Sequence, residues 1–237
     1  MHRSSPDRNR VRPDGGTIDQ PPLDVMSETN LRPQTLAENA SRLETVVQLL
    51  NQPALTRVYV YICYWGPVTA ADIIETLELS KSTTYEYIDS LVALGLAERD
   101  DSTRPQQLTA DPLIIVEQYV PIVITPTVLH ALALQEINDD VAYFVDRHGV
   151  GKLIAALRGA GLNFAGKTTQ RMIANDIDVP AAEGMTIVHA LLPALAVGQQ
   201  RDPYFEHLFP DVHDQIDIPY DFDTDRLNPD RSVVDGE

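Results

Sequence analysis

One segment, Ala70–Leu96, constrains the fold more than any other part of the chain. It predicts two short helices joined by a tight turn, because two amphipathic patterns follow each other closely. Thr69 is a typical N-cap for the first helix, and Ser82 is expected to cap the second. The second helix should end at Gly95, a typical left-handed C-terminal residue. Its predicted inward face consists of Thr84, Ile88, Leu91 and either Leu94 or Val92.

The flanking sequence adds a hairpin and a supporting helix. Leu96–Arg99 alternates like a strand, Asp100–Pro105 is a polar turn, and Gln106–Thr109 is expected to return as a second strand. Upstream, Leu55–Trp65 is apolar on most sides and fits either a helix or a strand. The helices that follow favour a helix there. A further helix is expected to begin at Thr35 and to end near residues 51–53.

This arrangement resembles the winged helix-turn-helix regulators of the MarR/ArsR/TrmB superfamily. Their pattern is an apolar turn residue, two or three Ser/Lys/Thr residues, a Tyr, an apolar pair and a closing Leu-x-x-x-Gly-Leu. A family of haloarchaeal helix-turn-helix proteins is similar over most of residues 35–197. The similar stretches are Asn51–Ile62, Gly66–Ala70, Thr83–Ile88 and Val145–Val150. The resemblance implies a sequence-specific transcription regulator that binds double-stranded DNA, and two-fold DNA sites favour a homodimer.

On this interpretation the second helix of the pair reads the major groove. The side chains expected to face the bases are Ser82, Thr83, Glu86 and Tyr87. Those expected to contact phosphates are Ser80 and Lys81 in the turn and Arg104 in the hairpin. Tyr85 and Tyr87 differ by two positions, so we expect Tyr85 to pack inward and Tyr87 to reach outward. The alternative is an adaptor whose winged helix binds a protein partner.

The charge balance is unusual for a DNA-binding protein. The chain carries a formal net charge of −17. Its only lysines are Lys81, Lys152 and Lys167. This composition is typical of proteins from salt-adapted cells, while an acidic mesophilic protein with a disordered acidic tail is the alternative. None of the large segments is basic, which opposes DNA binding in dilute buffer. In molar salt, screening limits the range of that repulsion to a few ångströms.

The fold class expected is mostly α with a small β wing. Residues 1–33 should be disordered, 34–111 should hold the N-terminal helix and the winged helix, and 112–200 a helical C-terminal domain. Residues 201–237 should be an acidic, largely disordered tail. Within the C-terminal domain, 112–124 is expected to be β-rich or extended. Helices are predicted over residues 126–135, 139–147, 150–160, 166–177 and 181–196.

Two interpretations fit Thr168–Ala196, which predicts a helix, a short turn and a longer helix. It is either a second helix-turn-helix or a module that packs against a second copy of the chain. Arg158, Lys167 and Arg171 favour nucleic acid, whereas the apolar positions of the two helices favour packing. The packing interpretation is preferred.

Residues Gly161–Thr168 match the phosphate-binding loop pattern G-x-x-x-x-G-K-[ST] at every defined position. Such a loop works only between a buried strand and a helix, where backbone amides wrap the phosphate. The preceding Lys152–Leu157 predicts a helix, and Leu162 and Phe164 make the loop interior bulky. We therefore reject nucleotide binding.

The remaining candidates for chemistry are weak. His207 and His213, with Asp211 and Asp214 nearby, lie in the expected tail and lack the rigid support of a metal site. No catalytic arrangement of Ser, Cys, His and Asp is evident, so we expect no enzyme, cofactor or metal. Cys63 is the only cysteine, and no signal peptide or membrane span is expected. A cytoplasmic protein follows, and the sequence indicates no particular small-molecule effector.

Overall fold

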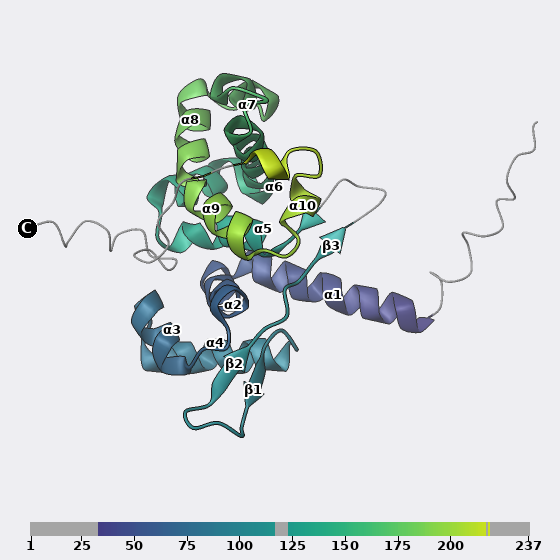
Figure 1. Ribbon diagram of the computed structural model, residues 1–237, viewed down its shortest axis with the longest axis vertical. Helices are drawn as coiled ribbons and strands as arrows, with labels where there is room; N and C mark the ends of the chain where they lie inside the picture. Colours follow the sequence, from purple (N-terminus) through teal and green to yellow (C-terminus); the bar gives the residue numbers. More distant parts are fainter. Residues whose placement is uncertain (1–32, 117–122, 217, 219–237) are drawn as a thin grey trace, which may run out of the picture. The chain divides into compact units, whose positions relative to one another are not determined.

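The computed structural model describes residues 33–116, 123–216 and 218 (Figure 1). The chain divides into two compact units, residues 1–42 and residues 43–237. The first contributes only the beginning of helix α1, Pro33–Asn51, to the described residues. The helix therefore starts two residues before the expected Thr35. The disorder expected for residues 1–32 lies outside the described residues.

The described residues are mostly helical, as the sequence predicts, and they contain two small antiparallel hairpins, of which the first is the predicted wing. The first hairpin pairs β1, Glu98–Asp100, with β2, Gln107–Thr109, and Arg99 lies opposite Leu108. Val68 extends this hairpin, because its backbone N–H and C=O both bond to Leu108. The second hairpin pairs β3, Ile115–Val116, with β4, Val123–Ile124, within the segment expected to be extended.

Three helices form the winged-helix part: α2, Pro53–Trp65; α3, Ala70–Leu77; and α4, Lys81–Ala93. Helix α2 is buried over most of its surface, which explains why its sequence shows no polar face. The choice between helix and strand for Leu55–Trp65 is thereby settled as a helix. The Tyr59 hydroxyl donates to the Asp111 carbonyl and accepts from the Leu113 backbone N–H, each at 2.8 Å. These bonds fix α2 to the chain that leaves the wing.

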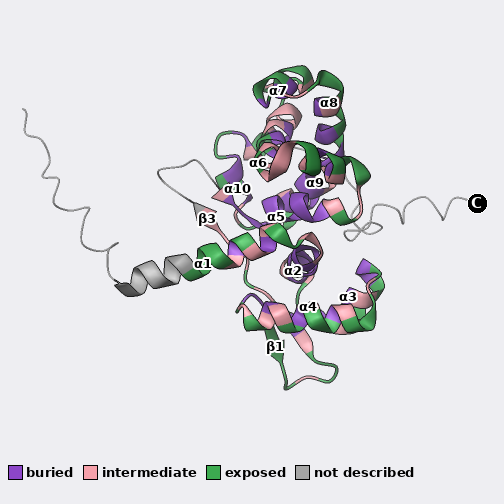
Figure 2. Cartoon of the chain, turned by 180° about the vertical axis from the view of Figure 1, so that it is seen from behind, coloured by how far each residue is buried: buried purple, intermediate pink, exposed green. Residues whose placement is uncertain are grey.

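Helices fill the rest of the described chain. They are α5, Pro126–Ala133; the 3₁₀ turn Leu134–Glu136; α6, Asp139–Phe164; α7, Gln170–Asp176; α8, Ala181–Ala190; α9, Leu192–Arg201; α10, Phe205–Leu208; and the 3₁₀ turn His213–Gln215. Helix α5 is buried throughout and packs on both α2 and α9 (Figure 2). The two predicted domains thus share one core within residues 43–237.

Several helix boundaries differ from the prediction for local reasons. Gly149 interrupts α6 with φ 81° and ψ 165°, at the break expected between residues 147 and 150. Helix α7 begins at Gln170 rather than Gly166, because Gly166 has φ 71° and Thr169 provides the N-cap. The helix expected over 181–196 is divided at Leu191, two residues before Pro193.

The folded region extends beyond the predicted end at residue 200. Phe205, Phe209, Val212 and Ile216 are buried in the common core. The Asp202 carboxylate is also buried and accepts from both the backbone N–H and the hydroxyl of Thr127, at 2.9 and 2.6 Å. The expectation of a largely disordered tail is therefore wrong for residues 202–216. Residues 219–237 lie outside the described part of the chain.

One stretch among the described residues, Ala181–Arg201, is long and apolar enough to cross a membrane. Half of its most apolar window is buried inside the fold. Core helices of globular proteins pass the same test, so this stretch is weak evidence for a membrane span.

Candidate nucleic-acid interface

The turn between α3 and α4 defines the first helix-turn-helix. Thr69 caps α3 and forms a reciprocal capping box with Asp72. The helix ends at Leu77, and Glu78 adopts a left-handed conformation with φ 55°. Helix α4 then begins at Lys81 with Ser80 as its N-cap. The expectation that Ser82 caps this helix is wrong, because the chain turns already at Glu78 and brings Ser80 to the cap position.

A cation on the supporting helix fixes the end of α3. Arg57 of α2 is buried, and its guanidinium donates to the Leu77 carbonyl at 3.3 Å. Burial lowers the pKa of Arg57, and the negative charges of Glu136 and Glu78 partly offset this effect. The orientation of the helix-turn-helix is thus tied to α2.

The inward face of α4 is as predicted: Thr84, Ile88 and Leu91 are buried. The two tyrosines are the reverse of the expectation, since Tyr85 is 45% exposed while Tyr87 is half-buried against the core. At about 100° per residue, Tyr87 lies closer to the centre of the buried face than Tyr85 does. Tyr85 therefore belongs to the outer surface of α4.

Apart from Tyr87, the predicted site residues lie in three places. Ser80, Ser82 and Thr83 meet at the start of α4, where the Ser80 hydroxyl lies 3.0 Å from that of Ser82 and 2.8 Å from that of Thr83. Lys81 and Glu86 are exposed on the same helix. Arg104 is exposed on the wing, and its guanidinium donates to the carbonyls of Asp101 and Thr103.

Sequence reasoning did not identify two residues that belong to this surface. Tyr85 and Arg99 line a pocket of about 170 Å³ between the start of α3, α4 and the wing. Arg99 also forms an ion pair with Asp89 of α4, which joins the wing to the helix. The angular position of Tyr85 on the helix could have shown from sequence that this residue faces outward. The ion pair of Arg99 with Asp89 could not be predicted in this way, because it depends on the register of the hairpin.

The electrostatic character of this surface is acidic. Residues 70–109 contain eight acidic and three basic side chains. The Ser102 hydroxyl and backbone N–H donate to the Asp100 carboxylate and lower its pKa, so the tip of the wing remains anionic. A DNA complex of this surface therefore needs salt that screens the repulsion.

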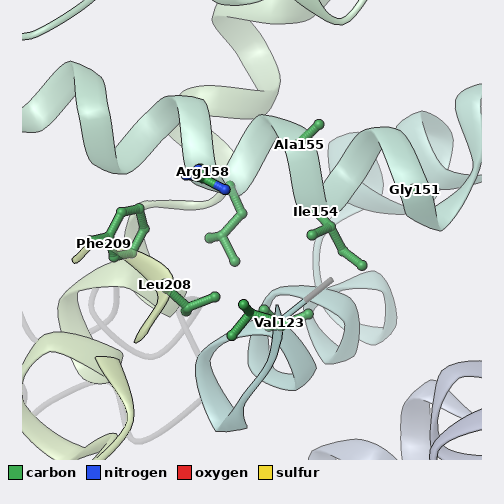
Figure 3. A pocket seen from close by; sticks show the side chains of 9 residues that line it. Val123, Gly151, Ile154, Ala155, Arg158, Leu208 and Phe209 are labelled. Atoms are coloured by element: carbon green, nitrogen blue, oxygen red, sulfur yellow. The ribbon is translucent and has the colours of Figure 1, made fainter. Parts of the chain in front are cut away.

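Other candidate sites contain little that could support chemistry. A cavity of about 360 Å³ lies between β4, α5, α6 and α10, and among the described residues that line it Arg158 is the only charged one, the others being apolar (Figure 3). The loop-like pattern at Gly161–Thr168 begins inside the last turn of helix α6 rather than after a strand, and Gly161 packs against the Phe209 ring. Over the described ranges no three His, Cys, Asp or Glu side chains group as metal ligands would.

Comparison with protein families gives two matches. Residues 56–123 match the family described as sugar-specific transcriptional regulator TrmB. Residues 135–200 match DUF7437, a family of unknown function. Neither the comparison with curated proteins nor that with solved structures gives a match. The first match covers most of α2, all of α3 and α4, and the wing, and it supports a DNA-binding transcription regulator.

Proposed function

We propose that the chain is a sequence-specific transcription regulator that binds double-stranded DNA through its winged helix. The observation that carries this proposal is the α3–turn–α4 arrangement, whose residues coincide with the match to a transcription-regulator family. Helix α4 is the recognition helix, and the β1–β2 hairpin is the wing.

The roles of individual side chains follow from their exposure. Tyr85 and Glu86 face the bases, and the Glu86 carboxylate can accept from a cytosine amine. Lys81 and Arg104 contact phosphates. The Ser80 hydroxyl forms hydrogen bonds with the hydroxyls of Ser82 and Thr83 at the start of α4. These residues therefore act mainly by placing the start of the helix against the DNA backbone. Tyr87 supports the helix from its half-buried position.

The active form is a homodimer in the cytoplasm of a salt-adapted cell. The net charge of −17 supports the salt adaptation. Leu43 and Val47 of α1 support the dimer, because they are 55% and 51% exposed on one side of the helix. Together with Leu50 they continue the apolar pattern of the sequence, which suits pairing with the same helix of a second copy. The mass of the protein in solution, with and without Leu43→Glu, tests this part.

Selection of bound fragments from randomised duplex DNA in molar KCl tests the function itself. If the chain is a sequence-specific regulator, a common DNA sequence is enriched over successive rounds of selection. An adaptor that binds a protein partner is the alternative, and the acidic surface around α4 is the observation in its favour. If no sequence is enriched at any KCl concentration, the adaptor becomes the better account.

A further inference from the structure

The helical part of the chain contains a second helix-turn-helix, displaced by 100 residues from the first. Thr69 caps α3 and Thr169 caps α7. The turns contain equivalent left-handed residues, Glu78 with φ 55° and Asp178 with φ 53°. Helix α4 begins three residues after its left-handed residue, and so does α8. The second helix-turn-helix is therefore α7, the turn and α8 (Figure 1).

The burial of side chains follows the same register. The equivalent buried pairs are Ile73 and Ile173, Leu77 and Ile177, Thr84 and Gly184, Ile88 and Val188, and Leu91 and Leu191. The equivalent exposed pairs are Lys81 and Ala181, Ser82 and Ala182, Tyr85 and Met185, Glu86 and Thr186, and Asp89 and His189. Helix α8 thus presents to solvent the same face with which α4 reads DNA in the proposed function.

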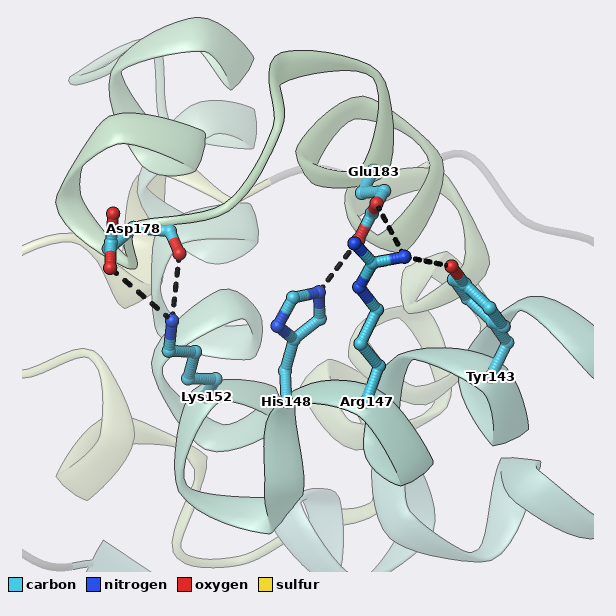
Figure 4. Close-up of polar contacts among 6 residues, drawn as sticks. All are labelled: Tyr143, Arg147, His148, Lys152, Asp178 and Glu183. Atoms are coloured by element: carbon cyan, nitrogen blue, oxygen red, sulfur yellow. Dashed lines mark hydrogen bonds and ion pairs between the residues drawn. The ribbon is translucent and has the colours of Figure 1, made fainter.

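The turn of the second unit is also held by a cation from its supporting helix. Lys152 of α6 donates to the Asp178 carbonyl at 2.8 Å and lies 3.9 Å from the Asp178 carboxylate (Figure 4). Arg57 plays the corresponding part for α3. Glu183 of α8 is anchored to α6 as well, by His148 at 2.6 Å and Arg147 at 3.6 Å. Helix α8 is therefore fixed in position, as a recognition helix must be.

Charge opposes DNA less in the second unit than in the first. Residues 167–190 contain two basic and three acidic side chains, whereas residues 70–109 contain three basic and eight acidic ones. Two of the three acids, Asp178 and Glu183, already face cations within the fold. Lys167 precedes α7 by three residues, Arg171 lies in its first turn, both are exposed, and within the described residues neither forms an ion pair.

The exposed face of α8 is compatible with a DNA groove. It carries no acid among its outward positions, and Ala181, Ala182 and Thr186 are short. Short side chains allow the backbone of a helix to approach the bases, and the methyl groups of Ala and Thr can contact thymine. His189 adds a hydrogen-bonding ring, which lies 3.1 Å from the Gln170 amide.

We infer that α7 and α8 form a second DNA-binding unit, with α8 in a major groove and with Lys167 and Arg171 on phosphates. This inference rests on the proposed function, since it extends the contact with DNA to a second site on the same chain. It reverses the packing interpretation of Thr168–Ala196 preferred from sequence. The exposed Met172 and Met185 are the features that a protein contact would use instead.

Two matched double variants of the full chain separate the units. Lys167→Gln with Arg171→Gln removes two exposed charges from the second unit, and Lys81→Gln with Arg104→Gln removes two from the first. The probe is a pool of duplex fragments selected by the wild type. The readouts are a hydroxyl-radical footprint, the KCl dependence of affinity, and the mass of the free protein. In each variant the negative slope of log affinity against log KCl should become smaller in magnitude by about 2, because each phosphate contact contributes about 0.9 to that slope.

The inference predicts two protected DNA segments, each lost with its own variant. If only Lys81→Gln with Arg104→Gln changes the footprint and the salt dependence, the inference is wrong and the proposed function stands. If only the second-unit variant has these effects, the inference stands and α4 is not the recognition helix. A second-unit variant that changes the mass but not the footprint shows a protein interface and overturns the inference. A wild type that selects no DNA overturns both.

Discussion

The hydroxyl of Ser80 accepts a hydrogen bond from the Thr83 backbone N–H at 3.2 Å and so caps helix α4. Replacing an N-cap serine with alanine costs about 1 kcal/mol of stability. We therefore predict that Ser80→Ala lowers the free energy of unfolding by about that amount. Ser82→Ala is the matched control and should stay within about 0.5 kcal/mol, because exposed helix positions tolerate substitution. Denaturant titration measures both, and an equal or larger loss for Ser82→Ala would restore Ser82 as the cap.

His130 of α5 is a second residue with a measurable consequence. It is fully buried, its ring lies edge-on to that of Tyr64 of α2, and neither ring nitrogen has a hydrogen-bond partner among the described residues. Burial, with a smaller contribution from the Arg57 charge, lowers the pKa of His130 to about 3. The folded protein therefore keeps this imidazole neutral at a pH where the unfolded chain protonates it.

The direction of the pH effect follows from this difference. An unfolded histidine titrates near pH 6.5, so the unfolded state binds the extra proton between about pH 6.5 and 3. Stability is lost as the pH falls through that window. We predict that the wild type loses about 1.4 kcal/mol per pH unit relative to His130→Leu between about pH 6 and 4. His207→Leu, at an exposed site, is the control. Parallel pH profiles for the wild type and His130→Leu would show that the ring is not buried as described.

At the scale of elements, local chemistry made most of the winged helix predictable. Capping by Thr69, the apolar spacing of α4 and the left-handed Gly95 all act within a few residues of one another. The reversal of Tyr85 and Tyr87 was also accessible from the helical angle. By contrast, the ion pair of Arg99 with Asp89 joins a strand to a helix, and no local pattern encodes it.

The second helix-turn-helix depends on a close approach of its two helices. A Cβ atom placed on Gly184 would lie 2.4 Å from the Cβ of Ala174, whereas one on Gly151 of α6 would meet no atom of the described residues within 4 Å. We predict that Gly184→Ala destabilises the protein by about 1–3 kcal/mol through overpacking. Gly151→Ala should instead stabilise it by up to about 1 kcal/mol, because alanine favours the helix. Equal effects in denaturant titration would contradict the packing of α7 against α8.

At the scale of the whole molecule, the sequence misplaced the end of the folded region. The segment after Asp202 is acidic and rich in proline, which is typical of a tail. Its aromatic and aliphatic residues nevertheless fill the core beside α5 and α6, as Phe209 does against Gly161. Composition could not reveal this, because the partners of these side chains lie many residues away in the chain.

The net charge is a property of the whole molecule with a direct thermodynamic consequence. At −17, the folded chain repels itself in dilute buffer, and screening by salt relieves this repulsion. We predict that the melting temperature rises between dilute buffer and molar KCl. A melting temperature that is constant or falls over this range would contradict salt adaptation.

The central claim is that the outer face of α4 reads DNA sequence. Tyr85→Ala with Glu86→Ala removes two exposed side chains from this face, and Tyr143→Ala with Asp146→Ala removes matched residue types from the exposed side of α6. The measurement is a fluorescence titration, in molar KCl, of each protein against a selected DNA site and a scrambled one. The account predicts that the α4 variant remains folded but loses about 1–3 kcal/mol of discrimination per base contact, while the α6 variant discriminates like the wild type. An α4 variant that is folded and still separates the two DNAs as well as the wild type would contradict the account.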